Sequence, residues 1–291
     1  MSENNLSPET LKFLEEKCFK IRGDILNLVY RFGMGHLGGE LSMVEVAVAL
    51  YYKYMNWDPK DVKNPDRDRF ILSKAHCSET LYSIFSDMGL YTQDYIVEHF
   101  ECLDKSQFGQ HSNRKYVDAI EVSAGSLGHG LPIAVGYALG ARHQKQNYRV
   151  FVMVGDGELD EGTNWEAMQS GAHYGLNNLV CICDRNQLQM TGKTEEIMAQ
   201  RDLAAKAEAF GWNPIVIEDG NDIAQVCAAL EKLPERDYAK KSKPTFIVSN
   251  TVKGKGVSFM EGNHKWHGGG LGKEQFEQAL EDIKKNRKAF A

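Results

Sequence analysis

Residues 148–189 read YRVFVMVGDGELDEGTNWEAMQSGAHYGLNNLVCICDRNQLQ, and this stretch decides the fold. Two apolar runs rich in Val and Ile, Arg149–Val154 and Leu179–Cys183, are each too short for a buried helix. Between them lies a segment of helical length, where Thr163-Asn-Trp-Glu166 fits a capping box. The pattern predicts a strand, a helix and a second strand, which implies a parallel sheet with a right-handed crossover.

Polar residues follow both predicted strands, at the edge where open parallel sheets bind ligands. Gly155-Asp156-Gly157 ends the first strand, and Asp184-Arg185-Asn186 ends the second. We therefore expect Asp156 and Asn186 to lie side by side, with the carbonyl of Leu188 nearby. These hard oxygen ligands suit Mg²⁺ or Ca²⁺, with water and phosphate oxygens completing the shell. The flanking glycines, Gly155 and Gly157, let backbone N–H groups approach a phosphate closely.

Two other interpretations of the same residues compete with a metal and phosphate site. The Gly-Asp-Gly triplet is also typical of an ordinary strand-to-helix turn. A calcium loop of the EF-hand type is excluded, because Glu161 occupies the position that requires glycine and Ala167 the position of the final glutamate.

Composition bounds the class of protein. A chain of 291 residues can form one large α/β domain or two small ones, and 42% hydrophobic with 25% charged residues is ordinary for a soluble protein. The formal net charge of −6 argues against a nucleic-acid surface. We expect no membrane span and no signal peptide. The six cysteines form no C-x-x-C pair, which favours free thiols in the cytoplasm.

The remaining patterns extend the α/β prediction over the whole chain. Ser7-Pro8-Glu9 marks the start of an amphipathic helix. A second capping box, Ser42-Met-Val-Glu45, follows a glycine-rich loop and predicts a helix to about Tyr54. Further helices are expected at 78–88, 131–142 and 222–233, and strands near 70, 120, 151, 181, 215 and 247. We predict a single doubly wound α/β domain over residues 1–291, with a mostly parallel sheet, helices on both faces and the helix of residues 1–35 packed on it.

Histidines recur in several loops of the chain. His36 lies in the glycine-rich loop 33–39, His76 ends the segment Asp68-Arg-Phe-Ile-Leu-Ser-Lys-Ala-His, and His111 follows Gly109-Gln. His264 and His267 have a spacing that could suggest a metal pair, but no third ligand lies near them in the sequence, so a structural role is favoured. Histidines on one edge could bind sugar hydroxyls and transfer protons near neutral pH.

These motifs together resemble those of a known family. Gly-Asp-Gly after a strand, Asn177-Asn178 before the next and Asp184-x-Asn186 at its end resemble the thiamine-diphosphate-binding motif. The stretch GDGELDEGTNWEA is similar to the transketolase version of it. The loop of His36, the segment ending at His76, the loop Gly125-Ser-Leu-Gly128 and the segment from Lys-Gly-Lys-Gly256 to Trp-His267-Gly also resemble transketolase segments. The resemblance covers nearly the whole chain, from His36 to His267.

Membership of the transketolase family would imply thiamine diphosphate with Mg²⁺ or Ca²⁺ as cofactors, and reversible transfer of a two-carbon ketol unit between a ketose and an aldose, usually as phosphates. The metal ligands carried over are Asp156, Asn186 and Leu188. The catalytic residues are His36, His76, His111, His267 and Glu161. The cofactor-binding residues are His76, Gly125, Leu127, Gly155, Asp156, Gly157, Glu161, Asn186, Met190 and His267. For His129, in the same glycine loop, we expect a structural role.

Transketolases of usual length continue beyond the Trp-His-Gly segment into a pyrimidine-binding domain, which supplies a glutamate, and a C-terminal domain. This chain ends at Ala291. The resemblance therefore implies the N-terminal subunit of a split transketolase, which is active only with a C-terminal subunit, in an assembly with two copies of each chain. Glu161 is expected to contact the partner's glutamate, and Glu166 could join that acidic network. A favourable interaction of Glu161 with a helix dipole is the alternative.

Ala75, Cys77 and Glu79 depart from the family pattern, and Glu79 adds a negative charge near a helix start. These departures keep open a transketolase devoted to a modified sugar, or half of a deoxyxylulose-phosphate-type synthase. A non-catalytic regulatory relative is the alternative from another class, although Asp156, Asn186 and the histidines are retained. A P-loop protein is excluded, because the sequence contains no G-x-x-x-x-G-K-[ST] motif.

Overall fold

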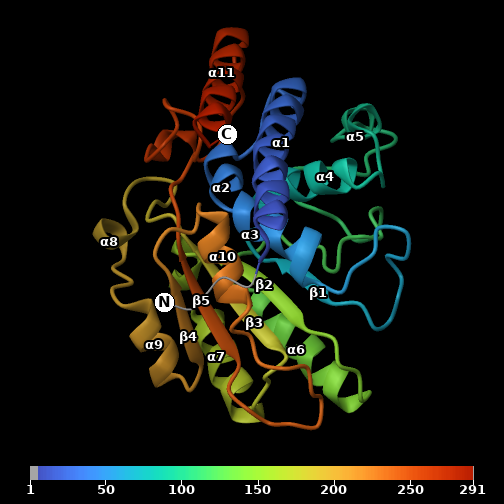
Figure 1. Cartoon of the computed structure of the whole chain (residues 1–291), viewed down its shortest axis with the longest axis vertical. Coiled ribbons are helices and arrows are strands. Elements are labelled where there is room, and N and C mark those ends of the chain that lie inside the picture. The colour runs from blue at the N-terminus through green and yellow to red at the C-terminus, as the bar shows by residue number, and fades with distance from the viewer. Residues whose placement is uncertain (1–5, 291) are drawn as a thin grey trace.

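A parallel sheet forms the centre of the computed structural model, which describes residues 6–290 and their side chains up to residue 287. Within these residues the sheet has five strands in the order β1-β2-β3-β5-β4, and every neighbouring pair is parallel (Figure 1). The strands are β1 (Arg69–Leu72), β2 (Val150–Gly155), β3 (Leu179–Arg185), β4 (Asn213–Ile217) and β5 (Thr245–Asn250).

Helices cover both faces of this sheet. The helices are α1 (Pro8–Phe32), α2 (Leu37–Ser42), α3 (Val44–Ala49), α4 (Ser78–Asp87), α5 (Gln93–Glu98), α6 (Gly130–His143), α7 (Gly162–Tyr174), α8 (Thr194–Ile197), α9 (Leu203–Ala209), α10 (Ile223–Leu230) and α11 (Lys273–Phe290). A π-helical turn, η1 (Leu50–Tyr54), follows α3, and short 3₁₀ turns occupy η2 (Ala75–Cys77), η3 (Gly157–Asp160) and η4 (His264–Trp266).

Two separate cores confirm the doubly wound arrangement. Phe151 and Met153 of β2 pack in a core with residues of α1, α3, α4 and α10. Val150, Val152 and Val154 of the same strand pack in a second core with residues of α6, α7 and α9. Because successive strand residues point to opposite faces, one continuous apolar run supplies both cores.

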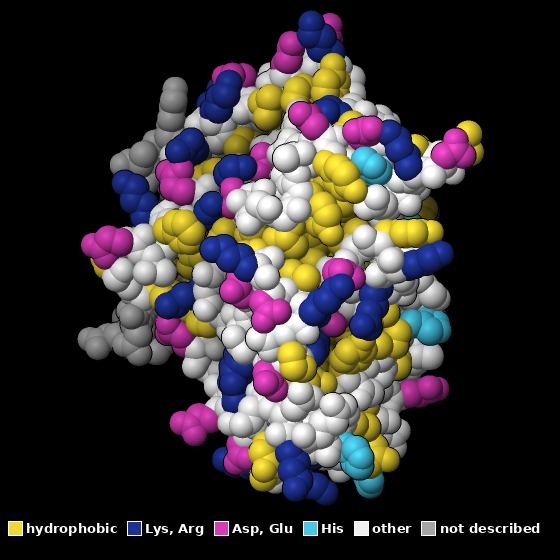
Figure 2. All heavy atoms as spheres, turned by 90° about the vertical axis from the view of Figure 1, so that its right-hand side faces the viewer, with side chains coloured by type: hydrophobic (Ala, Val, Ile, Leu, Met, Phe, Trp, Pro, Cys, Tyr) yellow, Lys and Arg dark blue, Asp and Glu magenta, His cyan; other side chains and the backbone are white. Residues whose placement is uncertain are grey.

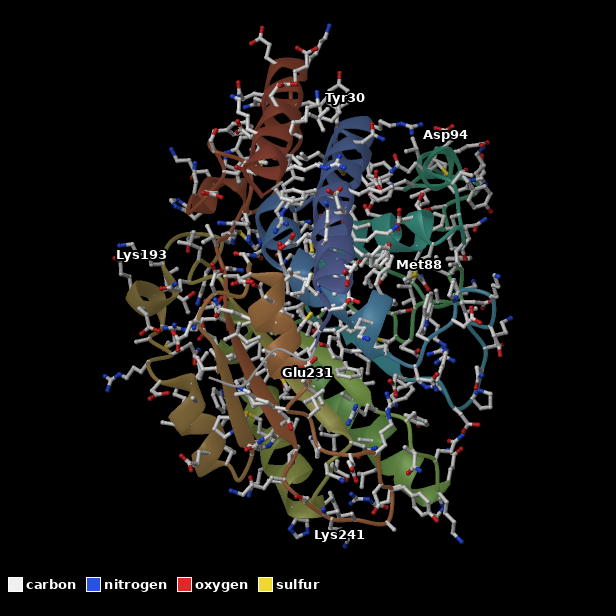
Figure 3. The ribbon with its side chains drawn as sticks, viewed as in Figure 1. Tyr30, Met88, Asp94, Lys193, Glu231 and Lys241 are labelled. Atoms are coloured by element: carbon white, nitrogen blue, oxygen red, sulfur yellow. The ribbon has the colours of Figure 1, made fainter. Side chains whose placement is uncertain are left out.

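The N-terminal helix begins and ends where the sequence predicts. The hydroxyl oxygen of Ser7 accepts a hydrogen bond from the backbone N–H of Thr10 at 3.2 Å, and Gly33, with φ of 77°, ends the helix in the left-handed region. Tyr30 extends from α1 toward α11 (Figure 3), where its ring stacks on Phe276 with 4.3 Å between the centroids.

The predicted strand at residues 119–123 is wrong. This segment is irregular and pairs with no strand, although Ala119 and Ile120 are buried. The carbonyl of Glu121 accepts hydrogen bonds from the side chains of Arg114 and Tyr137 instead of a neighbouring strand. The apolar pattern of this segment reflects its burial. Side chains, rather than a neighbouring strand, supply hydrogen bonds to its backbone.

Both predicted capping boxes are also wrong, although a helix lies close to each. The helix before Ser42 already begins at Leu37, so part of the expected glycine loop is helical, and Ser42 donates to Asp184 at 2.7 Å. Helix α7 begins at Gly162, and the hydroxyl of Thr163 donates to the carbonyl of Gly128. In both places the residue lies inside a helix rather than at its N-cap, and its hydroxyl donates to a tertiary partner.

The described residues contain no helix that is both long enough and apolar enough to span a membrane. All six cysteines are free, and all except Cys102 are buried.

Candidate active site

A cavity of about 380 Å³ lies at the carboxyl ends of β1, β2 and β3. Every predicted site residue except Glu161 lines it. The lining comprises His36, Gly39, Lys74, His76, His111, Gly125, Leu127, Gly155, Asp156, Gly157, Glu158, Asn186, Leu188, Gln189, Met190, Lys253 and His267. Loops that are far apart in the sequence therefore meet in one site.

The predicted metal ligands lie together on the loops after β2 and β3. The carboxylate of Asp156 accepts hydrogen bonds from the backbone N–H groups of Gln187 at 2.7 Å and Gly157 at 2.9 Å. Gln187 adopts φ of 64°, which turns the chain after Asn186. The side-chain oxygen of Asn186 accepts from the N–H of Leu188 at 3.2 Å. This framework fixes the carboxylate and the amide at adjacent strand ends.

The donor set of this loop pair fits a hard cation. One carboxylate, one amide oxygen and one backbone carbonyl are oxygen ligands of the kind that Mg²⁺ and Ca²⁺ take. With three ligands from the protein, either cation keeps coordination positions for water and phosphate oxygens. Burial raises the pKa of Asp156, and the charge of Asp184 raises it further. A bound cation would offset this accumulation of negative charge. No cluster of three or more His, Cys, Asp or Glu side chains suited to a metal occurs in the described residues, so a cation here depends on amide and carbonyl oxygens.

Lys74 was not selected from the sequence, but it is a charged group of the cavity. Its ammonium group forms a buried ion pair with Asp184 and donates to the carbonyl of Gly39 at 2.8 Å. Burial opposes the charge, but Asp184 outweighs it and raises the pKa of Lys74. Its position directly after β1, two residues before His76, is the sequence signal that could have identified it.

Lys253, in the loop after β5, is the second lysine that the sequence reading did not select. Its ammonium group lies 2.9 Å from Nδ1 of His267 and donates to the carbonyl of Leu188 at 3.0 Å. Burial lowers the pKa of Lys253 to about 8, and the charge of Lys74 adds to this effect. Two lysines therefore place positive charge beside the predicted metal ligands, where an anionic group would be stabilised.

The four predicted histidines converge at the mouth of the cavity. The ring centroid of His36 is 5.1 Å from that of His76, 6.3 Å from that of His111 and 5.7 Å from that of His267. His76 and His267 are 5.3 Å apart. We call His36, His76, His111 and His267 the histidine rim.

Burial favours the neutral form of the imidazoles of His36, His76 and His267. Burial lowers the pKa of His36 to about 4, helped by the charges of His111 and Lys253. Burial and then Lys253 lower the pKa of His267 to about 4 as well, and burial lowers that of His76 well below its usual value. Neutral rings can both donate and accept hydrogen bonds, which suits hydroxyl groups of a polar ligand.

Glu158 joins three loops beneath the cavity and was also not selected. Its carboxylate accepts from the hydroxyl of Ser73 after β1, from the N–H of Gly128 at 2.8 Å and from the N–H of Gly155 at 3.1 Å. Gly128 has φ of 81°, and a Cβ atom there would lie 2.6 Å from Cβ of Glu161, so the loop requires glycine. Glu158 therefore fixes the predicted cofactor loop against two strand ends.

Glu161 lies outside the cavity. It is exposed at the N-cap of α7, beside Gly128, and its side chain makes no capping hydrogen bond. Glu166 is exposed on the first turns of the same helix. Both carboxylates are accessible to another molecule, and the position of Glu161 is also favourable for the helix dipole.

The departures from the family pattern lie behind the cavity wall. Ala75 and Cys77 are fully buried, and neither lines the cavity. Glu79 is fully buried as well, and its carboxyl group contacts that of Glu40. His129 is exposed at the N-cap of α6 with Nδ1 on the carbonyl of Leu127, and His264 lies outside the cavity.

The parallel strand order and the cavity at the strand ends define a doubly wound α/β domain with a candidate ligand site at one edge of its sheet, and comparisons identify its family. The family model for the transketolase thiamine diphosphate binding domain matches residues 16–291. The chain belongs to the transketolase family, and it is of the kind found as the N-terminal subunit of split transketolases.

Among relatives, an apulose-4-phosphate transketolase subunit of Phocaeicola vulgatus is 39% identical over 94% of both chains. The 6-deoxy-6-sulfo-D-fructose transketolase subunit SqwG of a Clostridium species is 34% identical over 94% of this chain and 96% of that one. The transketolase of Leishmania mexicana superposes with a TM-score of 0.86 at 28% identity, covering 93% of this chain and 41% of that structure. The chain thus spans less than half of the solved transketolase that it resembles.

Proposed function

We propose that this chain supplies the diphosphate- and metal-binding half of a transketolase that transfers a two-carbon ketol unit between a ketose and an aldose, usually as phosphates. The observation that carries the proposal is the single cavity that brings together Asp156, Asn186 and Leu188, the lysines Lys74 and Lys253, and the histidine rim. This set combines a place for a cation, a place for an anion and polar groups for a sugar.

Each part of the cavity has a role in the proposal. Asp156, Asn186 and the carbonyl of Leu188 would hold Mg²⁺ or Ca²⁺. Lys253 would neutralise charge on a diphosphate, while the charge of Lys74 is balanced by Asp184. Gly125, Leu127, Gly155, Gly157 and Met190 would contact the rest of the cofactor. When bound, thiamine diphosphate supplies the stabilised carbanion that ketol transfer requires.

The histidine rim would orient the sugar. Neutral His36, His76 and His267 can hold hydroxyl groups in either hydrogen-bonding sense, and each can accept or return a proton at a ring nitrogen during the reaction. Because burial lowers the pKa of these rings, proton transfer would begin with a neutral ring that accepts a proton, rather than with a ring that titrates near pH 7.

A partner chain is part of the proposal. Relatives that match this chain along nearly their whole length are named as transketolase subunits, which supports a second subunit. We infer that it carries the pyrimidine-binding domain and that two copies of each chain assemble, with Glu161 and Glu166 meeting the partner's glutamate. Exposed apolar side chains, Ile133 of α6 and Tyr174 of α7 among them, support docking on α6 and α7. Figure 2 shows further hydrophobic patches between charged groups on the face that carries α5, where Tyr95 is exposed.

The substrate class proposed is a modified ketose or its phosphate. Two relatives named for apulose-4-phosphate are 39% and 38% identical to this chain, whereas human transketolase is 32% identical. Half of a deoxyxylulose-phosphate-type synthase is less favoured, because relatives matched along nearly their whole length are named as transketolase subunits. A non-catalytic relative is less favoured, because the cavity contains every predicted site residue except Glu161. Assaying the reconstituted pair against a panel of ketoses decides among these.

We expect His267→Ala to lower kcat/KM of the reconstituted enzyme on the order of 30-fold, or about 2 kcal/mol, because it removes a positioned hydrogen-bonding group from the rim. Its folding should change little, since the side chain lies at the cavity mouth. Steady-state kinetics and thermal melting measure the two effects. His264→Ala is the matched control, three residues away and outside the cavity. Full activity with an unchanged KM in the His267 variant would remove this histidine from the site.

The proposal of half an enzyme has a direct test. We expect the purified chain to leave exchange of the thiamine C2 proton slow, and the added partner to make exchange fast, because the glutamate and ring pocket lie on the second chain. NMR follows the exchange in deuterated water. Fast exchange together with ketol transfer by the purified chain alone would show that it is not half an enzyme.

A further inference from the structure

A pair of buried carboxyl groups lies behind the histidine rim. Glu40 belongs to α2 and Glu79 to α4, and both are fully buried and in contact with each other. Oε1 of Glu40 accepts a hydrogen bond from the backbone N–H of His36 at 3.3 Å. The other three oxygens of the pair have no hydrogen-bond donor among the described residues. Two ionised carboxylates in contact, with one donor for their four oxygens, would be strongly unfavourable.

The surroundings do not neutralise two negative charges. The charge of Lys74 acts on Glu40, but its ammonium group is already paired with Asp184. Cys77 also faces the pair, while Glu101 and Tyr82 face Glu79, and none of these groups is a cation. The arrangement is stable if one carboxyl group keeps its proton and donates it to the other, as in other carboxyl pairs.

The pair also joins the elements that carry the histidines. His36 precedes α2, and His76 lies in the turn that leads into α4. The hydroxyl of Ser78 accepts from the N–H of Ser112, and Tyr82 donates to the carbonyl of Gly109, so α4 also holds the loop of His111. A bond between Glu40 and Glu79 therefore crosses the junction beneath three rim histidines.

We propose that Glu40 and Glu79 share one proton, and that this proton-sharing pair positions the histidine rim by fastening α2 to α4. The two glutamates act through their neighbours and touch no ligand in the cavity, so they are positioning residues. Loss of the shared proton would place two negative charges side by side and loosen the contact between the two helices.

The sign of the pH effect follows from the environment. Burial raises the pKa of Glu40 to about 7, and burial and then the charge of Glu40 raise the pKa of Glu79 well above its usual value. A raised folded pKa gives stability that is complete below the ordinary glutamate value and is lost as pH rises through the folded value. The pair should therefore stabilise the chain most near the ordinary glutamate value. Its contribution should fall with each pH unit until the pH reaches the folded values, about 7 for Glu40 and higher for Glu79.

Urea unfolding of the full chain between pH 5.5 and 8.5 tests the shared proton. Glu79→Gln keeps the shape, and its amide donates to Glu40 at every pH. We expect its unfolding equilibrium constant at pH 8.5 to be at least about tenfold smaller than that of the wild type. With each pH unit, the unfolding constant of the wild type should rise about tenfold more than that of the variant. This slope corresponds to one proton that is bound in the folded state and released on unfolding. Glu40→Gln should behave alike, which keeps the test decisive if one variant fails to fold.

Glu45→Gln is the matched control. Glu45 is a buried glutamate of α3, but Arg22 is its partner, with 2.6 Å between Nη1 and Oε1. Its replacement should increase the unfolding constant at both pH 5.5 and pH 8.5, whereas Glu79→Gln should decrease the constant at pH 8.5. If Glu79→Gln and Glu40→Gln also increased unfolding at pH 8.5, the pair would be ionised and held by a cation. An unchanged pH profile in both variants would equally overturn the shared proton.

Ring signals of ¹³C-labelled histidine test the positioning role without any assay of activity. Between pH 5.5 and 8.5 the buried rings of His36 and His76 do not titrate themselves, but Lys253 does, and its effect on their signals is common to wild type and variant. We expect a larger shift in the wild type than in Glu79→Gln, with assignments from His36→Gln and His76→Gln, and the difference reports movement. Equal shifts in the two proteins would show that the pair affects stability alone.

Discussion

Replacing Asp156 with alanine is expected to weaken binding of Mg²⁺ and diphosphate by about 100-fold or more, about 2.7 kcal/mol at 25 °C. Asp156 is the charged member of the oxygen set, and the amide of Asn186 with the carbonyl of Leu188 cannot by themselves replace a carboxylate. The measurement is titration calorimetry of inorganic diphosphate into the purified chain with and without Mg²⁺, which requires no partner.

The effect of Asp156→Ala on diphosphate affinity should change sign when Mg²⁺ is left out. Without Mg²⁺, the Asp156→Ala variant should bind diphosphate as well as or better than the wild type, because a buried negative charge is removed near Lys74 and Lys253. Glu196→Ala, which removes an exposed carboxylate of α8 that pairs with Lys193, should leave both titrations unchanged. Equal loss of affinity with and without Mg²⁺ would mean that Asp156 holds the loop rather than the metal.

Lys74→Met is expected to destabilise the chain by about 3–5 kcal/mol, because it leaves the carboxylate of Asp184 buried without its cation. The side chains of Lys74 and Asp184 are 2% and 1% exposed. Although Ser42 and Thr251 also donate to this carboxylate, neutral donors do not replace a charge. Urea unfolding monitored by circular dichroism gives the free energy of unfolding.

An exposed ion pair gives the comparison. Lys193 lies at the outer edge of the molecule (Figure 3) and pairs with Glu196, with both side chains about two-thirds exposed. Lys193→Met should cost about 0–1 kcal/mol, since water screens such pairs. Adding Asp184→Asn to Lys74→Met should restore part of the lost stability, because the unpaired charge is gone. Similar losses in the Lys74 and Lys193 variants would contradict this account.

Most of the cavity could be predicted from local sequence because its residues follow strands. In a parallel sheet the carboxyl ends meet at one edge, so any residue just after a strand is brought to the same place. Asp156, Asn186, His76 and Lys74 all follow this rule, and Lys74 was missed only because a lysine after a strand is less distinctive than a histidine in a family motif. Lys253 belongs to the same group, since it follows β5 by three residues.

The hydrogen-bond partners of side chains were harder to predict from the sequence. Serine and threonine three residues before a glutamate predict a cap, but Ser42 and Thr163 bond to Asp184 and to the carbonyl of Gly128, which lie elsewhere in the sequence. The irregular segment at residues 119–123 has the burial of a strand without a strand beside it. Local patterns record what a residue prefers, and distant partners decide whether the preference is met.

The sequence by itself determined the parallel sheet, the edge that carries the cavity and the set of oxygen ligands, because the period of apolar residues and the position of strand ends are local properties. The histidines were identified by their resemblance to transketolase motifs. Only the tertiary structure decided the charge states. Glu79 looks like a surface acid in the sequence, but burial against Glu40 makes it a proton-sharing candidate, and burial also leaves the rim histidines neutral. The energy of a charge depends on its surroundings, and the fold alone supplies those.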